Sequence, residues 1–126
     1  MQGVYDFLHS KFQNDYLMKL QCTDHIGTMS KKYISLSDHS FIGGSNLLTS
    51  QINRYKQIGF SFLDSFSIKN MILFGVGWWQ YQKDPNLISR IFLKNLLSNE
   101  IIHSVRDEYT KEKLEKVGLT NVLNTS

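Results

Sequence analysis

Apolar and polar positions follow one another in blocks, and in the second half of the chain these blocks predict strands and helices in turn. Residues 69–74 and 100–105 are short apolar runs that predict buried strands, and residues 121–123 predict another. Between them, apolar residues recur at helical spacing over residues 87–96, and a further helix is expected to stop at Gly118. Strands alternating with helices predict an α/β fold, with a Rossmann-like parallel sheet flanked by helices.

Two helix starts carry capping signals. Asp84 followed by Pro85 predicts an N-cap and a first helical residue, because proline lacks the N–H that this position leaves unpaired. Asp107 or Thr110 is expected to cap the helix that follows residues 100–105.

The first half of the chain has a weaker pattern. Residues 1–12 predict a helix, residues 15–22 a strand, and the polar stretch 23–37 has room for a short helix. Residues 38–42 predict a strand that runs directly into paired glycines, and residues 47–66 show partial helical spacing.

Ligands of parallel α/β sheets bind beyond the carboxyl ends of the strands, which directs attention to three loops. The first contains Gly43, Gly44, Ser45 and Asn46. Its glycines allow a sharp bend and close approach of backbone N–H groups to a ligand, and its serine and asparagine add polar groups. The alternative is a tight turn that binds nothing.

The second loop contains Gly75 and Gly77, which form half of a dinucleotide-binding fingerprint. Gln80 stands where the third glycine belongs, so nicotinamide or flavin binding is not expected. Three aromatic residues follow the second glycine: Trp78, Trp79 and Tyr81. They could stack on a sugar or belong to the core or an interface.

Arg106 is the candidate ligand-binding residue of the third loop. It follows a predicted strand and precedes a predicted helix, whose N-terminal N–H groups favour an anion. Its guanidinium could bind phosphate or carboxylate through two parallel hydrogen bonds. The alternatives are a salt bridge to Asp107 or Glu108, or capping of a neighbouring loop.

Composition narrows the function classes. The net charge of +3 comes from scattered basic residues, so nucleic-acid binding is not favoured. Cys22 is the only cysteine, and no signal segment begins the chain, so we expect a cytoplasmic protein. The longest apolar run, residues 71–79, is about half a membrane span. The spacing of the histidines predicts no metal site, and His103 is expected to be packed and hydrogen-bonded.

An extended motif gives the chain a family resemblance. It comprises residues 104–110 (SVRDEYT), Leu114, Gly118 and residues 121–125. Together with the glycine-rich residues 41–48 and with residues 73–77, this motif resembles the polysaccharide pyruvyltransferase family. The resemblance is clearest over residues 38–125.

The resemblance implies a transferase that moves a pyruvyl group from phosphoenolpyruvate to a sugar hydroxyl pair of a cell-surface polysaccharide, forming a ketal. It implies no metal or cofactor, two Rossmann-like domains in a GT-B-like arrangement, and partners that are the donor and a saccharide acceptor. Arg106 would contact the donor, and residues 43–46 would line the acceptor side.

The chain departs from the family pattern at both ends, so residues 1–126 are interpreted as a partial N-terminal domain. By this interpretation the chain alone is inactive and self-associates through an exposed sheet edge. Two alternatives stay open, a nucleotide-sugar glycosyltransferase of similar fold and a truncated, non-enzymatic binding module.

Overall fold

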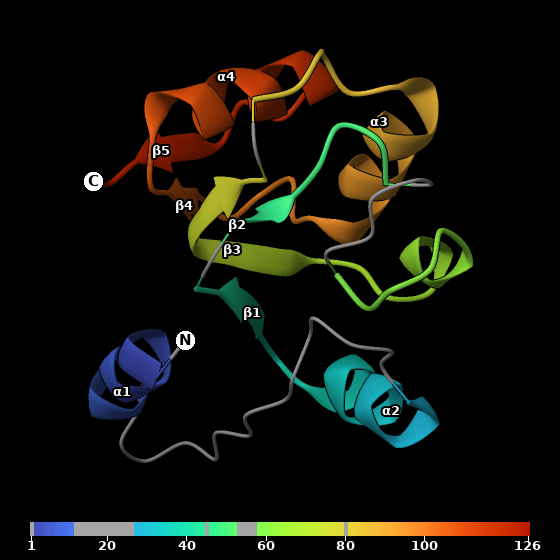
Figure 1. Ribbon diagram of the computed structural model, residues 1–126. Coiled ribbons are helices and arrows are strands. Elements are labelled where there is room, and N and C mark those ends of the chain that lie inside the picture. Colours follow the sequence, from blue (N-terminus) through green and yellow to red (C-terminus); the bar gives the residue numbers. More distant parts are fainter. Residues whose placement is uncertain (1, 12–26, 45, 53–57, 80) are drawn as a thin grey trace.

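The computed structural model describes residues 2–11, 27–44, 46–52, 58–79 and 81–126. Helices and strands follow one another along the chain in ten elements (Figure 1). They are α1 (Gln2–Lys11), α2 (Thr28–Leu36), β1 (Ser40–Gly43), β2 (Asn46–Leu48), the 3-10 helix η1 (Leu63–Phe66), β3 (Met71–Trp78), α3 (Leu87–Leu96), β4 (His103–Val105), α4 (Glu108–Val117) and β5 (Val122–Asn124).

A parallel sheet forms the middle layer of the molecule. Its order is β1-β3-β4-β5, and β2 pairs with the far end of β3. Helices α3 and α4 lie together on one side of the sheet (Figure 1). Helix α1 packs on β3 through Phe7 and Phe74, and α2 contributes Ile34 to the core and pairs with η1 through Lys31 and Asp64. The predicted α/β fold with a parallel sheet and flanking helices is therefore confirmed, while the GT-B-like two-domain arrangement stays a prediction.

The core lies between the sheet and the layer formed by α3 and α4. Phe92 and Leu96 of α3 and Leu114 of α4 are fully buried against Leu73 and Val105 of the sheet. This is the apolar stripe that the spacing of residues 87–96 predicts. Burial of these faces fixes how the two helices lie on the sheet, and thus where the residue before α4 stands.

Both ends of α4 match the prediction, whereas the start of α3 does not. Asp107 caps α4 by accepting a hydrogen bond from the Thr110 N–H at 2.7 Å, and Gly118 ends the helix with a φ of 108°. Helix α3 is capped by Asn86, whose side chain accepts from the Ser89 N–H at 2.9 Å. The predicted N-cap, Asp84, lies two residues too early because its carboxylate pairs with lysines of α4.

The predicted strand that runs into Gly43 and Gly44 is confirmed by β1, whereas the prediction that the next strand ends at Gly75 is wrong. Gly75 and Gly77 lie inside β3, and the pairing register between β3 and β4 shifts at Gly75, which has a φ of 66°. Gly44, with a φ of 112°, separates β1 from β2, so that both run beside β3. A non-glycine residue is strained at either positive φ.

Other predictions for the first half have mixed outcomes. Helices α1 and α2 confirm the helix over residues 1–12 and the short helix within 23–37. The helical spacing of residues 47–66 was misleading, because the described part of that stretch holds the end of β2 and η1. The predicted strand at residues 15–22 lies outside the described residues.

Candidate functional site

Strand register brings the three predicted loops together at the carboxyl edge of the sheet. Asn46, the first residue of β2, is the direct partner of Gly77 in β3. On the other side of β3, Val76 pairs with Val105, and the Arg106 N–H donates to the Val76 carbonyl at 3.2 Å. Asn46 in β2, Gly77 in β3 and Arg106 directly after β4 therefore form a row at this edge.

The side chains of this row converge over Gly77. A Cβ atom at Gly77 would overlap the side-chain oxygen of Asn46 and would lie 2.7 Å from Nε and 3.2 Å from Cδ of Arg106. Such distances are shorter than normal contacts, so any larger residue would displace both side chains. The missing side chain of Gly77 is what allows an amide and a guanidinium to approach each other here.

Arg106 is exposed, and its guanidinium pairs with no acidic side chain of the described residues. The predicted alternative partners are engaged elsewhere. Asp107 caps α4, and Glu108 accepts a hydrogen bond from Asn124 at 3.3 Å. The guanidinium keeps its N–H donors for a ligand, and its planar fork matches a carboxylate or phosphate.

The N-terminus of α4 contributes less to an anion site than the sequence suggests. The Asp107 carboxylate already accepts from the Thr110 N–H, and Glu108 adds a second acidic residue in the first turn. These charges offset the positive end of the helix dipole. Attraction for an anion at this edge therefore rests on Arg106.

A pair of hydroxyl groups connects β4 with the end of β5. Ser104 lies in β4, and Thr125 directly follows β5. The Ser104 Oγ atom lies 2.6 Å from Oγ1 of Thr125 and accepts from the Gly75 N–H at 3.3 Å. No local sequence pattern indicates this pair, because Ser104 and Thr125 meet only through the pairing of β4 with β5.

Of the predicted site residues, Asn46, Gly77 and Arg106 meet at one point. Gly43 ends β1 and Gly44 makes the bend that carries the chain into β2, so their role here is to place Asn46. Gly75 lies in β3 two residues before Gly77, and its N–H donates to the Ser104 hydroxyl. Ser45 lies outside the described residues.

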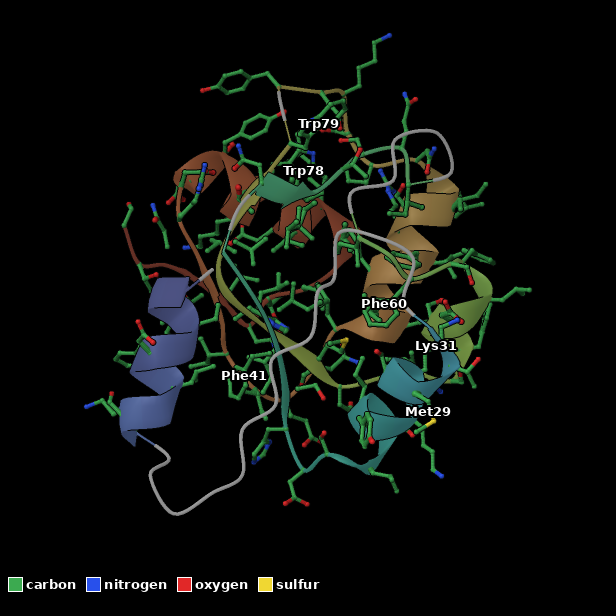
Figure 2. All side chains as sticks on the ribbon, turned by 60° about the horizontal axis from the view of Figure 1, so that its bottom comes forward. Met29, Lys31, Phe41, Phe60, Trp78 and Trp79 are labelled. Atoms are coloured by element: carbon green, nitrogen blue, oxygen red, sulfur yellow. The ribbon has the colours of Figure 1, made fainter. Side chains whose placement is uncertain are left out.

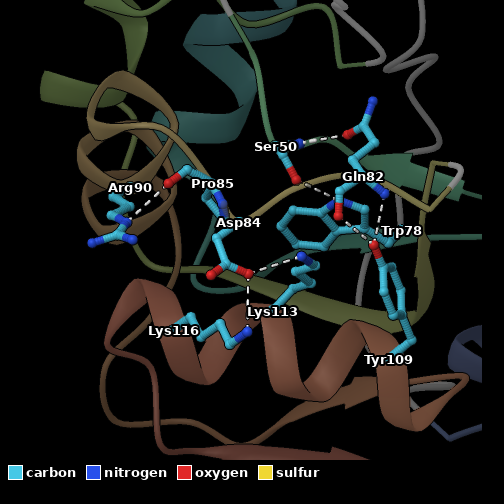
Figure 3. A network of polar contacts seen from close by, with 9 residues as sticks. All are labelled: Ser50, Trp78, Gln82, Asp84, Pro85, Arg90, Tyr109, Lys113 and Lys116. Carbon is cyan, nitrogen blue, oxygen red and sulfur yellow. Dashed lines mark hydrogen bonds and ion pairs between the residues drawn. The ribbon is translucent and has the colours of Figure 1, made fainter.

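Residues 81–86, which lie between β3 and α3, are held by hydrogen bonds on two sides (Figure 3). The Gln82 side chain accepts from the Ser50 N–H at 2.8 Å and from the Thr49 hydroxyl at 3.1 Å. The Tyr109 hydroxyl accepts from the Gln82 N–H at 2.7 Å and donates to the Gln82 carbonyl at 2.8 Å. The loop is thereby held between the segment after β2 and the first turn of α4.

Asp84 anchors the same loop farther along α4. Its Oδ1 atom lies 3.0 Å from Nζ of Lys113 and 2.9 Å from Nζ of Lys116 (Figure 3). Hydrogen bonds from Lys116 and Lys113 lower the pKa of Asp84, and the same contact raises the pKa of Lys116. One carboxylate and two ammonium groups leave this cluster with a net charge of +1, and its ion pairs hold the loop against α4.

The aromatic residues that follow Gly77 separate into different environments. Trp78 is buried, and its indole N–H donates to the Ser50 hydroxyl at 3.1 Å. Trp79 lies beside it at the same end of β3, far from Met29 and Lys31 of α2 (Figure 2). Tyr81 is 89% exposed. A platform made of all three side chains is therefore excluded, since Trp78 belongs to the core.

His103 is packed and hydrogen-bonded, as predicted. Its Nδ1 atom accepts from the Leu73 N–H at 3.0 Å, so Nε2 carries the proton and donates to the Ser98 carbonyl at 2.7 Å. Burial lowers its pKa, and the bond to Ser98 offsets part of that shift. Within the described residues no group of three or more His, Cys, Asp or Glu side chains could hold a metal ion.

A comparison with family models matches residues 2–126 to polysaccharide pyruvyl transferase. The chain belongs to this family. The matched residues include Asn46, Gly77 and Arg106. Membership of the family indicates that the protein is a transferase of the polysaccharide pyruvyltransferase kind. No curated protein and no solved structure matches the chain. Among the residues that the structure describes, no helix is long and apolar enough to cross a membrane.

Proposed function

We propose that the row formed by Asn46, Gly77 and Arg106 binds phosphoenolpyruvate in an enzyme that transfers its pyruvyl group to a saccharide of a cell-surface polysaccharide. The observation that supports this most directly is that the Arg106 guanidinium lies beside the Asn46 amide and pairs with no acidic side chain among the described residues. The donor carries a carboxylate and a phosphate, and both groups suit a planar fork of N–H donors.

In the proposed reaction, two sugar hydroxyl oxygens form bonds to C2 of the donor while the bond from C2 to the phosphate oxygen breaks. The donor methylene takes up one hydroxyl proton and becomes a methyl group, and the second proton leaves with inorganic phosphate. Arg106 would hold the anionic donor and balance negative charge as phosphate departs. The Asn46 amide can donate a further hydrogen bond to the same group.

Donor binding can be tested by following backbone amide chemical shifts during titration with phosphoenolpyruvate. Arg106→Ala is expected to weaken binding by at least about tenfold, because a charged hydrogen bond contributes about 1.5–3 kcal/mol. Arg106→Lys is expected to recover only part of the affinity, since an ammonium group lacks the planar fork. We expect binding without turnover in the 126-residue chain alone.

Lys69→Ala is the matched control for net charge. Lys69 is exposed and stands before β3, at the amino end of the sheet, so its removal changes the charge equally but leaves the carboxyl edge intact. Equal affinity of the native protein and Arg106→Ala would sink the proposal. Equal weakening by Lys69→Ala and Arg106→Ala would reduce the role of Arg106 to nonspecific attraction.

A further inference from the structure

Tyr81 is the most exposed aromatic side chain among the described residues, and it stands at the edge of the sheet that carries Arg106. It belongs to the loop that follows the carboxyl end of β3, and its ring contacts Tyr109 in the first turn of α4. An aromatic ring left in water at this edge has no role in the core.

The residues around Tyr81 are held in place by several contacts, although the Tyr81 ring itself is exposed to solvent. The ring centroids of Tyr81 and Tyr109 are 4.8 Å apart with an interplanar angle of 71°, the edge-to-face arrangement that aromatic pairs prefer. Tyr109 is fixed in turn by two hydrogen bonds to the backbone of Gln82, and the Lys113 ammonium lies 5.2 Å from its ring centre. These contacts hold Tyr81 and its neighbour Gln82 in place, so less conformational entropy of the protein is lost when a ligand binds.

An exposed ring of this kind suits a sugar. The C–H groups on one face of a pyranose carry partial positive charge and pack against the negative face of an aromatic ring, while the hydroxyl groups remain in water. A saccharide also suits the position. Tyr109 follows Arg106 by three residues, so their Cα atoms are at most about 11 Å apart, and a short oligosaccharide can bridge the two sites.

We propose that Tyr81, supported by Tyr109, is a stacking platform for a sugar ring of the saccharide acceptor. Its assignment to the acceptor rests on the proposed function, because the family reaction joins a saccharide to the anion held at Arg106. The platform places the sugar next to the donor site and leaves its hydroxyl groups accessible.

The test is a chemical-shift titration of the whole chain with neutral methyl glycosides of glucose, galactose and mannose. We expect shifts at the Tyr81 and Tyr109 rings for at least one glycoside. Tyr81→Ala should weaken that binding by about tenfold, and Tyr81→Trp should retain it because the stacking surface is kept. Tyr109→Phe should weaken it less, since it keeps the supporting ring but loses the two bonds to Gln82.

Tyr33→Ala is the matched control, because Tyr33 is also exposed, at 43%, but lies on α2 before the first strand. Its glycoside affinity should equal that of the native protein. The platform is refuted if no glycoside shifts the two rings, or if Tyr81→Ala binds as tightly as the native protein.

The neutral probes separate this inference from the proposed function. Arg106→Ala should retain glycoside binding, since no anion takes part. Donor binding at Arg106 without glycoside binding at Tyr81 would overturn the platform and leave the proposed function standing. Glycoside binding at Tyr81 without donor binding would support the platform as a saccharide site and contradict the proposed donor site.

Discussion

At Gly77 the absence of one methyl group leaves space for two polar side chains from neighbouring strands. The φ of this residue is not among the left-handed values in the chain, so its backbone suits any amino acid. The constraint comes from the Asn46 oxygen and the Arg106 Nε and Cδ atoms, which occupy the position of its missing Cβ. Gly77 thus serves the site by remaining small, and not by turning the chain.

Gly77→Ala is therefore expected to disturb both donor binding and folding. The new Cβ would displace Asn46 and Arg106, weakening phosphoenolpyruvate binding severalfold, while overpacking destabilises the fold by about 1–3 kcal/mol. Chemical-shift titration gives the affinity and urea denaturation the stability. Gly27→Ala is the control, because a Cβ there meets nothing within 4 Å. Unchanged donor affinity in Gly77→Ala would contradict the proposed convergence.

Single residues differed in how far the sequence could place them. The position of Arg106 between a strand and a helix was readable locally, as was the capping role of Asp107. The sequence could not show that Arg106 has no acidic partner among the described residues, because this depends on Asp107 and Glu108 having other partners. The partnership of Asn46 with Gly77 required the register of β2 with β3, which no local pattern contains.

Among the elements, β4 is connected to its neighbours through a buried histidine. The imidazole ring of His103 links the Leu73 N–H of β3 to the Ser98 carbonyl after α3. The backbone N–H of His103 donates to the Asn121 carbonyl before β5 at 2.8 Å. Protonation would place a hydrogen on Nδ1 and break the bond from Leu73. The arrangement therefore requires neutral His103.

This requirement predicts how stability depends on pH. The pKa of His103 is lowered in the folded protein, chiefly by burial, from a usual value of 6.5. As pH falls through that value, the unfolded chain binds the proton first, so the free energy of unfolding decreases until the lower folded pKa is passed. His103→Gln should flatten this dependence in urea denaturation between about pH 5 and 8. The exposed His39 gives the control His39→Gln, and a slope that survives in His103→Gln would refute the assignment.

Element boundaries show where local signals are outweighed by tertiary contacts. Asp84 followed by Pro85 has the features of a helix start, yet α3 begins two residues later because Asp84 is held by Lys113 and Lys116. Glycines predicted to end a strand at Gly75 lie inside β3, where a bulge tolerates them. The apolar periodicity of α3 and α4 was a better guide, since core burial decides it.

On the scale of the whole molecule, apolar side chains are exposed near one outer strand of the sheet. Leu123 of β5 and Ile102, just before β4, are both more than half exposed. The self-association predicted from the sequence stays a prediction, and this region is a place where it could occur. Exposed strand edges and apolar surface favour such contacts.

Leu123→Lys is expected to shift the protein toward the monomer, because a charge on an outer strand opposes strand-to-strand association. Sedimentation velocity over a range of concentrations measures the shift. Leu63→Lys is the matched control, since Leu63 is also exposed but lies on η1. A native protein that is monomeric at every concentration would contradict the predicted self-association.

Both tryptophans of the chain lie side by side at the end of β3, one buried and one half-buried. The tryptophan fluorescence of the molecule therefore originates at the carboxyl edge, next to Gly77. Circular dichroism, in contrast, reports on the helices throughout the chain. Fluorescence and dichroism that change at the same urea concentration would mean that the edge opens only with the whole domain, and an earlier fluorescence change would mean that the edge opens first.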